Sequence, residues 1–286
     1  MNVMRIGDAR QCIEEEEIMM NTWILDPPYN IGFDYQSDFK DNKKPDVYAS
    51  DLVDIIHTCA RSLQPDGSLF IIHYPEIISR LVDMIESDKL KQCDYYVRPE
   101  HQLELHQWIT WVYPSNIGHS KSKFTRASRA ILWFKKRGQK PYFNHLATVQ
   151  PYRNPNDKRI KQRIADGHKG VVHYDWWEIN MCKNVSKDYR GYVNQIPYKL
   201  LERLILHTTE KGDWVGDCFA GSGSTIAAAH KLGRNGWGCD INPECAEFWH
   251  DLPRRRRYND RNNTRSGRDA SNDRERRTDG DSVGGD

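Results

Sequence analysis

The sequence predicts an α/β fold built on a mostly parallel β-sheet. Short apolar runs such as 68–73, SLFIIH, are typical of strands buried on both faces of a parallel sheet. Apolar residues at helical spacing occur on either side of that run, at 47–63 and at 75–86. A helix, a strand, a glycine-rich loop, a second helix and a second strand then follow one another within 196–244. This alternation of strands and helices indicates a layered α/β domain.

The composition indicates a soluble globular protein. The 286 residues are 38% hydrophobic, enough for one large domain or two ordinary ones. No run approaches the roughly 18 apolar residues of a membrane span, and the first ten residues lack the apolar stretch of a signal peptide. We therefore expect a cytoplasmic protein with no membrane partner. The seven cysteines show no CxxC spacing, which argues against both a disulfide framework and a metal site.

The charge is distributed unevenly along the chain. Residues 1–119 hold 10 Lys/Arg against 20 Asp/Glu, whereas residues 120–170 hold 14 Lys/Arg against two acids. Aromatic residues are interleaved with the cations of this middle segment, which suggests a polyanion partner, because lysine and arginine release counterions from phosphates and rings can stack on bases. On charge alone, a solvated basic face is an equally good interpretation.

The remaining elements are expected as follows. A strand over 22–25 must stop at Asp26, because the two prolines after it have no N–H for a sheet ladder. Strands at 106–113 and 128–136 flank a basic loop at 114–125 and are expected to add antiparallel strands at the sheet edge. Between 137 and 195 the regular pattern fades, which indicates an inserted recognition segment. The tail, 254–286, has almost no apolar residues and is expected to be disordered.

The stretch DCFAGSGST, 217–225, predicts a nucleoside site. A triphosphate-binding loop needs a lysine before its Ser/Thr, and here Gly223 precedes Ser224. Glycines after a strand still allow a close approach of the backbone at a helix N-terminus. Asp240 ends the next strand, where a carboxylate can accept hydrogen bonds from ribose hydroxyls. The alternative, a loop used only for packing, does not account for Asp240.

The stretch DPPYN, 26–30, predicts a site for an amino group. Ligands of α/β sheets bind beyond the carboxyl ends of the strands, so this motif and the glycine loop should face one another. The Asp26 carboxylate and the Pro27 carbonyl can converge on one –NH₂ group, and Tyr29 offers a ring on which a base can stack.

In combination, the two motifs resemble those of amino-group DNA methyltransferases of the β class, which use S-adenosylmethionine. The resemblance covers about residues 5–250 and implies a doubly wound, Rossmann-like sheet with a permuted motif order. It divides the chain into a catalytic half (1–136), a target-recognition region (137–195), a cofactor-binding half (196–253) and the Arg-rich tail.

The resemblance also implies roles for individual residues. Those in catalysis are Asp26, Pro27, Pro28 and Tyr29. Those at the cofactor are Asp8, Gln195, Pro197, Asp217, Phe219, Ala220, Gly221, Ser222, Gly223, Thr225 and Asp240. In the basic middle segment, 120–170, the expected DNA-binding residues are Lys121, Lys123 and Arg126. Two positions depart from the family pattern: Ile196 replaces a lysine, and Ser128-Arg129 replaces a His-Glu pair.

The implied reaction is methylation of the N6 amine of adenine in double-stranded DNA. Cytosine-N4 methylation is the nearest alternative and resembles enzymes with Ser in place of Asp26. Protein or RNA methylation would normally use Asn at that position, with the glycine motif first. A non-catalytic DNA-binding module is a third interpretation, against which the intact motifs argue. The resemblance also allows a homodimer and a cognate restriction endonuclease as partners.

Overall fold

The computed structural model of the chain describes residues 1–33, 41–86, 98–114, 120–192 and 194–252. These residues belong to one compact unit, 1–253. The tail that we expect to be disordered lies outside the described residues, as do Cys93 and part of the basic loop. The elements are β1 (Asn2–Ile6), α1 (Ala9–Glu14), β2 (Met20–Leu25), α2 (Pro45–Arg61), β3 (Leu63–His73), α3 (Pro75–Glu86), η2 (Pro99–His101), β4 (Leu103–Val112), β5 (Ser128–Lys136), α4 (Lys158–Ala165), β6 (Trp176–Glu178), α5 (Tyr198–Thr208), β7 (Trp214–Asp217), α6 (Ser224–Lys231), β8 (Asn235–Asp240) and η3 (Pro243–Trp249).

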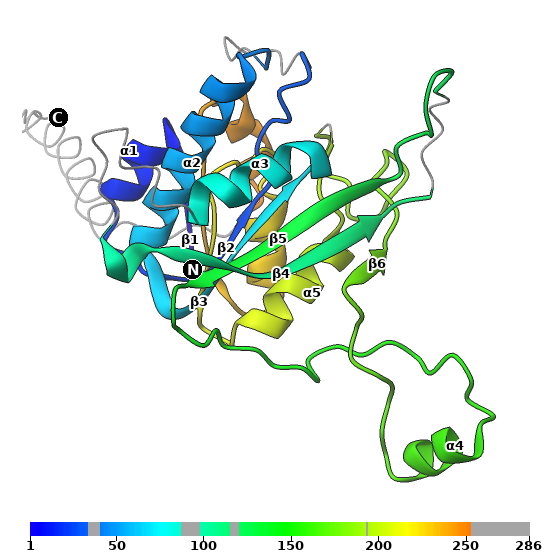
Figure 1. The fold of residues 1–286 in the computed structure, drawn as a ribbon. Coiled ribbons are helices and arrows are strands. Elements are labelled where there is room, and N and C mark those ends of the chain that lie inside the picture. The colour runs from blue at the N-terminus through cyan, green and yellow to red at the C-terminus, as the bar shows by residue number, and fades with distance from the viewer. Residues whose placement is uncertain (34–40, 87–97, 115–119, 193, 253–286) are drawn as a thin grey trace, which may run out of the picture. The chain divides into compact units, whose positions relative to one another are not determined.

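The described strands form one eight-stranded sheet in the order β1-β8-β7-β2-β3-β5-β4-β6 (Figure 1). The five strands from β1 to β3 run parallel, and β5 pairs antiparallel with both β3 and β4. The expected mostly parallel sheet with antiparallel strands at one edge is therefore confirmed. Because β2 and β7 are parallel neighbours, the segments after Leu25 and Asp217 both begin at the carboxyl ends of the parallel strands.

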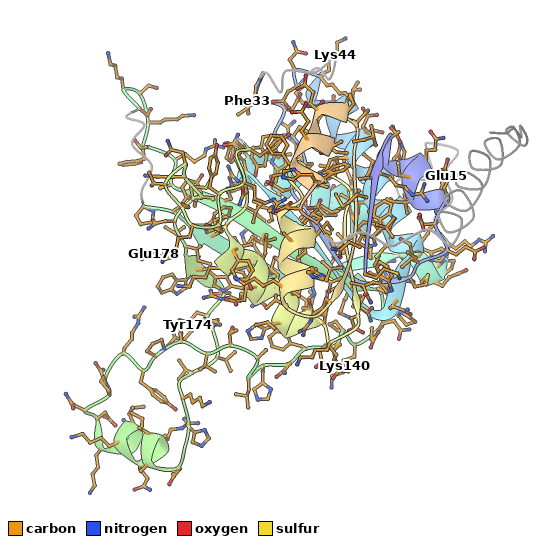
Figure 2. The ribbon with its side chains drawn as sticks, turned by 180° about the vertical axis from the view of Figure 1, so that it is seen from behind. Glu15, Phe33, Lys44, Lys140, Tyr174 and Glu178 are labelled. Carbon is orange, nitrogen blue, oxygen red and sulfur yellow. The ribbon has the colours of Figure 1, made fainter. Side chains whose placement is uncertain are left out.

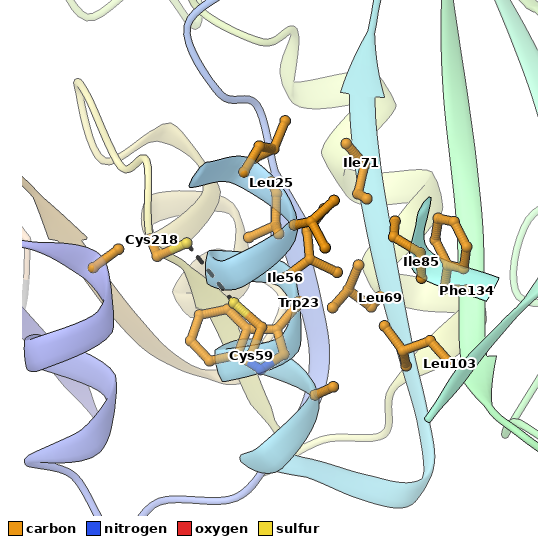
Figure 3. Close-up of a cluster of buried hydrophobic side chains, with 14 of the residues drawn as sticks. Trp23, Leu25, Ile56, Cys59, Leu69, Ile71, Ile85, Leu103, Phe134 and Cys218 are labelled. Carbon is orange, nitrogen blue, oxygen red and sulfur yellow. Dashed lines mark hydrogen bonds between the residues drawn. The ribbon is translucent and has the colours of Figure 1, made fainter. Parts of the chain in front are cut away.

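Helices cover both faces of the sheet, as a doubly wound fold requires. On one face, α1, α2 and α3 pack against alternate strand residues such as Trp23, Leu25 and Phe134 (Figure 3). On the other face, α5 and α6 pack against the strand residues that alternate with these, such as Ile24 and Trp133. The buried core therefore lies in two layers, one on each face of the sheet. These helices do not cover the carboxyl ends of the parallel strands, where the loops that follow these strands lie.

One predicted helix boundary is wrong. The helix expected through residue 63 ends at Arg61, and Leu63 begins β3. Leu63 pairs with Met20, while Ser68 pairs with Thr22, so β3 bulges over the Pro-Asp-Gly stretch that the sequence pattern predicts as a turn. The sheet pairing of Leu63 outweighs its helical spacing.

The segment 137–195 contains structure that the sequence pattern did not reveal. Its strand β6 extends the sheet by pairing parallel with β4. Tyr142, Asn144 and Thr148 still contact the body of the molecule; the chain then leaves it, forms α4, and returns before Tyr174 (Figure 2). A bridge between Gln150 and Val171 closes the base of this projecting arm. β1 and α1, at the start of the chain, were not predicted either.

In the described residues, no helix combines the length and the apolar character that crossing a membrane requires.

Candidate active site

A cavity of about 360 Å³ lies at the carboxyl ends of the parallel strands β1, β2, β7 and β8. Segments far apart in the sequence contribute its walls, and the structure thereby brings the tetrapeptide and the glycine loop together. The predicted site residues in its lining are Asp8, Asp26, Pro27, Pro28, Tyr29, Gln195, Asp217, Phe219, Ala220, Gly221, Ser222, Thr225 and Asp240.

The loop after the tetrapeptide is held by a buried carboxylate. Asp41 accepts hydrogen bonds from the backbone N–H groups of Asn30 (2.7 Å), Ile31 (3.1 Å) and Phe33 (3.0 Å). Asn30 has a φ of 55°, in the left-handed region that Asn tolerates better than most residues. Its side-chain amide donates to the carbonyl of Lys43 and accepts from the N–H of the same residue. The backbone that carries Asp26 is thus fixed on its C-terminal side.

A chain of hydrogen bonds fixes the second proline. The backbone N–H of Tyr74 donates to Nδ1 of His73 (2.7 Å), so the neutral ring carries its proton on Nε2. Nε2 then donates to the Tyr48 hydroxyl oxygen (2.8 Å), and that hydroxyl donates to the carbonyl of Pro28 (2.5 Å). Burial lowers the pKa of His73 to about 3, which keeps the ring neutral and the chain of donors intact.

Asp26 is a carboxylate in a desolvated setting. The Tyr29 hydroxyl donates to its Oδ1. Burial raises the pKa of Asp26 to about 6, and the positive charge of Arg129 and the Tyr29 hydrogen bond act in the opposite direction. Asp26 is therefore ionised at and above neutral pH and can accept hydrogen bonds there.

Two further carboxylates organise the glycine loop. Asp217 accepts from the N–H of Phe219 (3.0 Å), and burial raises its pKa to about 7. Asp240 accepts from the N–H of Gly221 (2.8 Å) and of Asn242 (2.9 Å), and burial raises its pKa as well. Each oxygen that accepts one backbone hydrogen retains a second lone pair. Asp240, which is partly exposed, therefore retains acceptor capacity toward the cavity.

The lining of the cavity is acidic. Two of its five carboxylates are paired with its two cations: Asp8 with Arg10 (2.9 Å) and Asp51 with Lys43 (2.6 Å). No ion pair in the described part of the chain involves Asp26, Asp217 or Asp240. A cavity with three such carboxylates attracts a cationic ligand.

The family model designated N6_N4_Mtase, described as DNA methylase, matches residues 20–250, a range that includes both motifs. The chain belongs to this family. It is 30% identical over 235 residues to the Type II methyltransferase M.HpaI of Haemophilus parainfluenzae, a match that covers 82% of this chain and 68% of that protein. The DNA adenine methyltransferase YhdJ of Escherichia coli (strain K12) is 26% identical over 223 residues, which cover 77% and 71%. The Type II methyltransferase M.BglII of Bacillus subtilis is 27% identical over 248 residues, and the match covers 80% of this chain and 62% of that protein.

Solved structures share the fold of this DNA methylase. The cytosine-N4-specific PvuII DNA methyltransferase superposes with a TM-score of 0.63 at 17% identity, covering 92% of this chain and 90% of that one. The structure titled as the M1.HpyAVI–SAM complex gives a TM-score of 0.58 at 19% identity, with 87% and 97% covered. The expected Rossmann-like methyltransferase fold is therefore confirmed.

Two residues that we expect at the cofactor lie outside the cavity lining of the methylase. Gly223 begins α6 with a φ of 73°, and a Cβ at this position would lie 2.9 Å from Leu252 and 3.0 Å from Trp249. Its glycine is required by backbone conformation and by packing against η3. Pro197 caps the N-terminus of α5. Both positions therefore support the cavity wall, and their contact with the cofactor stays a prediction.

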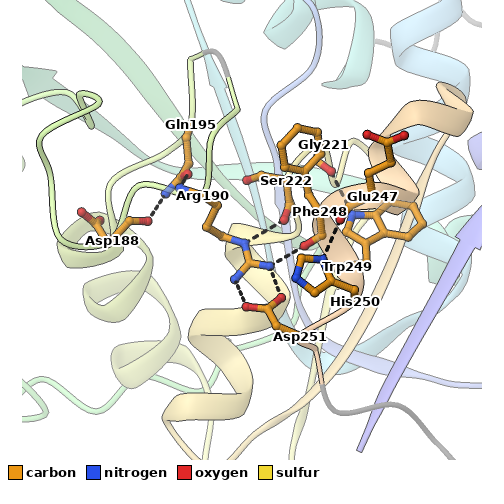
Figure 4. Close-up of polar contacts among 10 residues, drawn as sticks. All are labelled: Asp188, Arg190, Gln195, Gly221, Ser222, Glu247, Phe248, Trp249, His250 and Asp251. Carbon is orange, nitrogen blue, oxygen red and sulfur yellow. Dashed lines mark hydrogen bonds and ion pairs between the residues drawn. The ribbon is translucent and has the colours of Figure 1, made fainter.

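A strap formed by residues 188–192 and 194–195 covers the glycine loop of the methylase. Arg190 anchors it, donating to the carbonyls of Ser222 (2.9 Å) and Phe248 (2.5 Å) and pairing with both carboxylate oxygens of Asp251 (Figure 4). Gln195 accepts from the N–H of Arg190 and donates to the carbonyl of Asp188, so its polar atoms hold the strap together.

Tyr192 of this strap lines the cavity, and a Cβ at Gly221 would lie 2.8 Å from its ring. The ring also contacts Phe248 edge-on, at 5.3 Å between centroids. The glycine at 221 therefore makes room for the strap, whereas we expected it to make room for the ligand directly.

The three predicted DNA-binding residues differ in their surroundings. Lys121 and Lys123 are exposed. Arg126 lies over the ring of Tyr74, 3.8 Å from its centroid, and pairs with Glu76 of α3. Only the two lysines have the exposure expected of simple phosphate contacts.

Several residues that shape the site were missed in the sequence: Tyr48, Tyr74, Arg190 and Tyr192. Arg129 was noticed only as a departure from the family pattern. Its guanidinium is buried and lies 4.6 Å from the centre of the Tyr29 ring. The available signal was a basic residue directly before the apolar run AILWF of a predicted strand, because such a residue is rarely buried without a partner.

Proposed function

We propose that this methylase transfers the methyl group of S-adenosylmethionine to the N6 amine of adenine in double-stranded DNA. The observation that carries the proposal is the Asp26 carboxylate, which shares one acidic cavity with Asp217 and Asp240. A carboxylate at the first position of the tetrapeptide can accept a hydrogen from the target amine, and this residue type favours adenine over cytosine by family resemblance.

The cavity fits the proposed cofactor. Its volume of about 360 Å³ lies in the usual range for small-molecule sites. Its unpaired carboxylates suit a sulfonium cation, and Asp240 is placed to accept hydrogen bonds from ribose hydroxyls. When bound, S-adenosylmethionine supplies an electrophilic methyl group.

Asp26 acts on the target amine. The lone pair of an exocyclic amine is delocalised into the base, so the nitrogen is a weak nucleophile. A hydrogen bond to the ionised carboxylate favours a pyramidal nitrogen and directs the lone pair away from the ring plane. As the new N–C bond forms and the methyl–sulfur bond breaks, positive charge develops on the nitrogen and is stabilised by Asp26. The methylated amine then loses one proton, to Asp26 or to water.

The target base must leave the duplex to reach this cavity. We propose that residues 137–195 form the target-recognition region and that Lys121 and Lys123 contact phosphates beside it. The arm between Gln150 and Val171 adds exposed cations, four of them in α4: Lys158, Arg159, Lys161 and Arg163. Contacts to phosphates would position the duplex and contribute most of the salt-dependent affinity.

Nucleoside analysis tests the proposal. The chain is expressed in a host without its own DNA methylation, and the host DNA is digested and analysed by mass spectrometry. We expect N6-methyldeoxyadenosine with the wild type and none with Asp26→Ala. Detection of N4-methyldeoxycytidine instead would mean that the substrate is cytosine and not adenine. Unmodified DNA from cells that contain the folded protein would contradict methyl transfer altogether.

A further inference from the structure

The aromatic ring of the tetrapeptide is enclosed by the protein itself. Tyr29 is only 4% exposed. The His73 ring lies edge-on at 4.8 Å, the Tyr74 ring lies at 4.7 Å with a tilt of 37°, and the Arg129 guanidinium lies over the ring at 4.6 Å. The Tyr29 hydroxyl also occupies one oxygen of Asp26. The groups that would receive a target base are therefore engaged within the protein, and at least one neighbour must move before a base can bind.

These three neighbours of Tyr29 differ in how firmly they are held. His73 is fully buried at the end of β3, and both of its ring nitrogens are hydrogen-bonded. Arg129 lies within β5 and is 3% exposed. Tyr74 is partly exposed and lies between β3 and α3. Displacing Tyr74 leaves the sheet intact, whereas displacing either of the others would expose a buried polar or charged group.

Tyr74 is itself held by the residue that directly follows the basic loop. Arg126 lies 3.8 Å from the centre of its ring and pairs with Glu76, which is exposed. Both contacts are weak near solvent, because water screens the charge of the guanidinium. A DNA phosphate offers the same guanidinium a stronger, bidentate partner. Phosphate binding at Arg126 would therefore remove one of the groups that hold Tyr74, leaving its contacts with Tyr29, His73 and Arg129.

We propose that Tyr74 occupies the place of the target base when no DNA is bound, and that it is released when Arg126 turns to a phosphate. This inference rests on the proposed function. It makes Tyr74 a positioning residue. The target base takes over the contact with the Tyr29 ring that Tyr74 makes in the free protein, and the base site stays closed until the duplex backbone has been bound.

Base-flipping fluorescence tests the proposal. The methylated position is first located in host DNA, and a duplex of that sequence then carries 2-aminopurine (or pyrrolocytosine, for cytosine) at this position. Tyr74→Ala removes the competing ring. At saturating DNA we expect the flipped fraction to rise and KM for DNA to fall, each by about 2- to 10-fold, the worth of one aromatic pair. The value of kcat should stay within about 2-fold.

Three further variants separate a displaceable ring from a structural one. Tyr74→Phe retains the ring and should behave as the wild type, while Tyr74→Leu replaces Tyr74→Ala if that variant does not fold. Arg126→Gln should also raise the flipped fraction at saturating DNA, although it removes a cation.

A flipped fraction that is unchanged or lower in Tyr74→Ala would overturn the proposal, because Tyr74 would then be plain packing or a permanent wall of the base site. If the wild type methylates DNA while this result is obtained, only the role of Tyr74 fails. If the wild type transfers no methyl group to DNA, the proposed function fails, and the role of Tyr74 fails with it.

Discussion

The two ends of the cavity hold their carboxylates in different ways. At the glycine-loop end, Asp217 and Asp240 accept hydrogen bonds from backbone N–H groups. At the tetrapeptide end, Asp26 accepts from the side chain of Tyr29, which is enclosed by other side chains. A backbone donor stays in place when a ligand binds, whereas a side chain can rotate away. The glycine-loop end is therefore preformed, and the tetrapeptide end is arranged to change when its substrate binds.

The strongest test of this difference is Asp26→Ala. We expect methyl transfer to fall by about 10³-fold or more, the loss typical of removing a group that stabilises developing charge. Affinity for S-adenosylmethionine should change little, because the glycine loop does not depend on Asp26. Single-turnover transfer of a labelled methyl group and calorimetric titration measure the two effects. Equal losses in both would mean that the two ends do not act separately.

Gly221→Val should have the reverse effect, with cofactor affinity lost first. A Cβ at this position would lie 2.8 Å from the Tyr192 ring, and the φ of 47° is strained for a β-branched residue. We expect affinity for S-adenosylmethionine to fall about 10- to 100-fold, equivalent to about 1.4–2.8 kcal/mol.

Gly233→Ala is the matched control for this substitution. Its φ is 78°, and its nearest neighbour would be the Lys211 side chain at 3.7 Å. It should lower thermal stability through backbone strain alone and leave cofactor affinity unchanged. If calorimetry gave the same affinity loss for both variants, the loss would reflect general destabilisation.

Cofactor binding should depend on pH through Asp217. Its pKa is raised to about 7, so the carboxyl group gains its charge between pH 6 and 8. Affinity for the sulfonium cofactor should rise over this interval, and affinity for S-adenosylhomocysteine, which lacks that charge, should rise less. Asp217→Asn should flatten the dependence. A titration series in which both ligands gave the same pH profile would exclude Asp217 as the cause.

The same ionisation affects stability with a defined sign. Because the pKa of Asp217 is higher in the folded protein than in the unfolded chain, the favourable contribution is present at low pH and is lost as the pH rises through about 7. Each unit of pKa difference corresponds to about 1.4 kcal/mol. Asp217→Asn should therefore stabilise the ligand-free protein at pH 8 and have little effect at pH 4, as chemical denaturation at the two pH values would reveal.

The smallest expected effect concerns the exposed cations. Neutralising Lys121 and Lys123 together should weaken DNA binding at all sequences and reduce the slope of log affinity against log salt by about 0.9 for each phosphate that is no longer neutralised. Arg126 is excluded from this pair because it contacts Tyr74 and Glu76. Deletion of residues 254–286 is the comparison. If it erased sequence preference while the double neutralisation left the slope unchanged, recognition would have been assigned to the wrong segment.

The sequence could predict the features that are encoded within one short stretch of the chain. The strand before Asp26 and the glycine loop with Asp240 are each encoded within a short stretch, so their residue types and spacing were sufficient to place them at one sheet edge. The continuous apolar run 68–73, which forms part of β3, made the sheet recognisable. The same reasoning failed at Leu63, because its partner Met20 lies in a different segment.

The enclosure of Tyr29 could not be predicted in this way. Tyr74, which follows β3, and Arg129 of β5 lie far from Tyr29 in the sequence and meet it only in the folded chain. β6 is three residues long, and α4 has only Ile160 and Ile164 at helical spacing within a strongly charged arm, so both patterns are too short to identify the elements. Such tertiary contacts determine which surfaces of the site are open.

A crystal structure of the protein with S-adenosylmethionine tests most directly whether one cavity holds the cofactor at the glycine loop and presents its methyl group to Asp26. We expect the ribose hydroxyls at Asp240 and the methyl-bearing sulfur on the side of the cavity that Asp26 lines, with Tyr192 of the strap against the ligand. A ligand found instead in the separate pocket lined by Trp177, Arg203 and His207 would contradict the assignment of this cavity to methyl transfer.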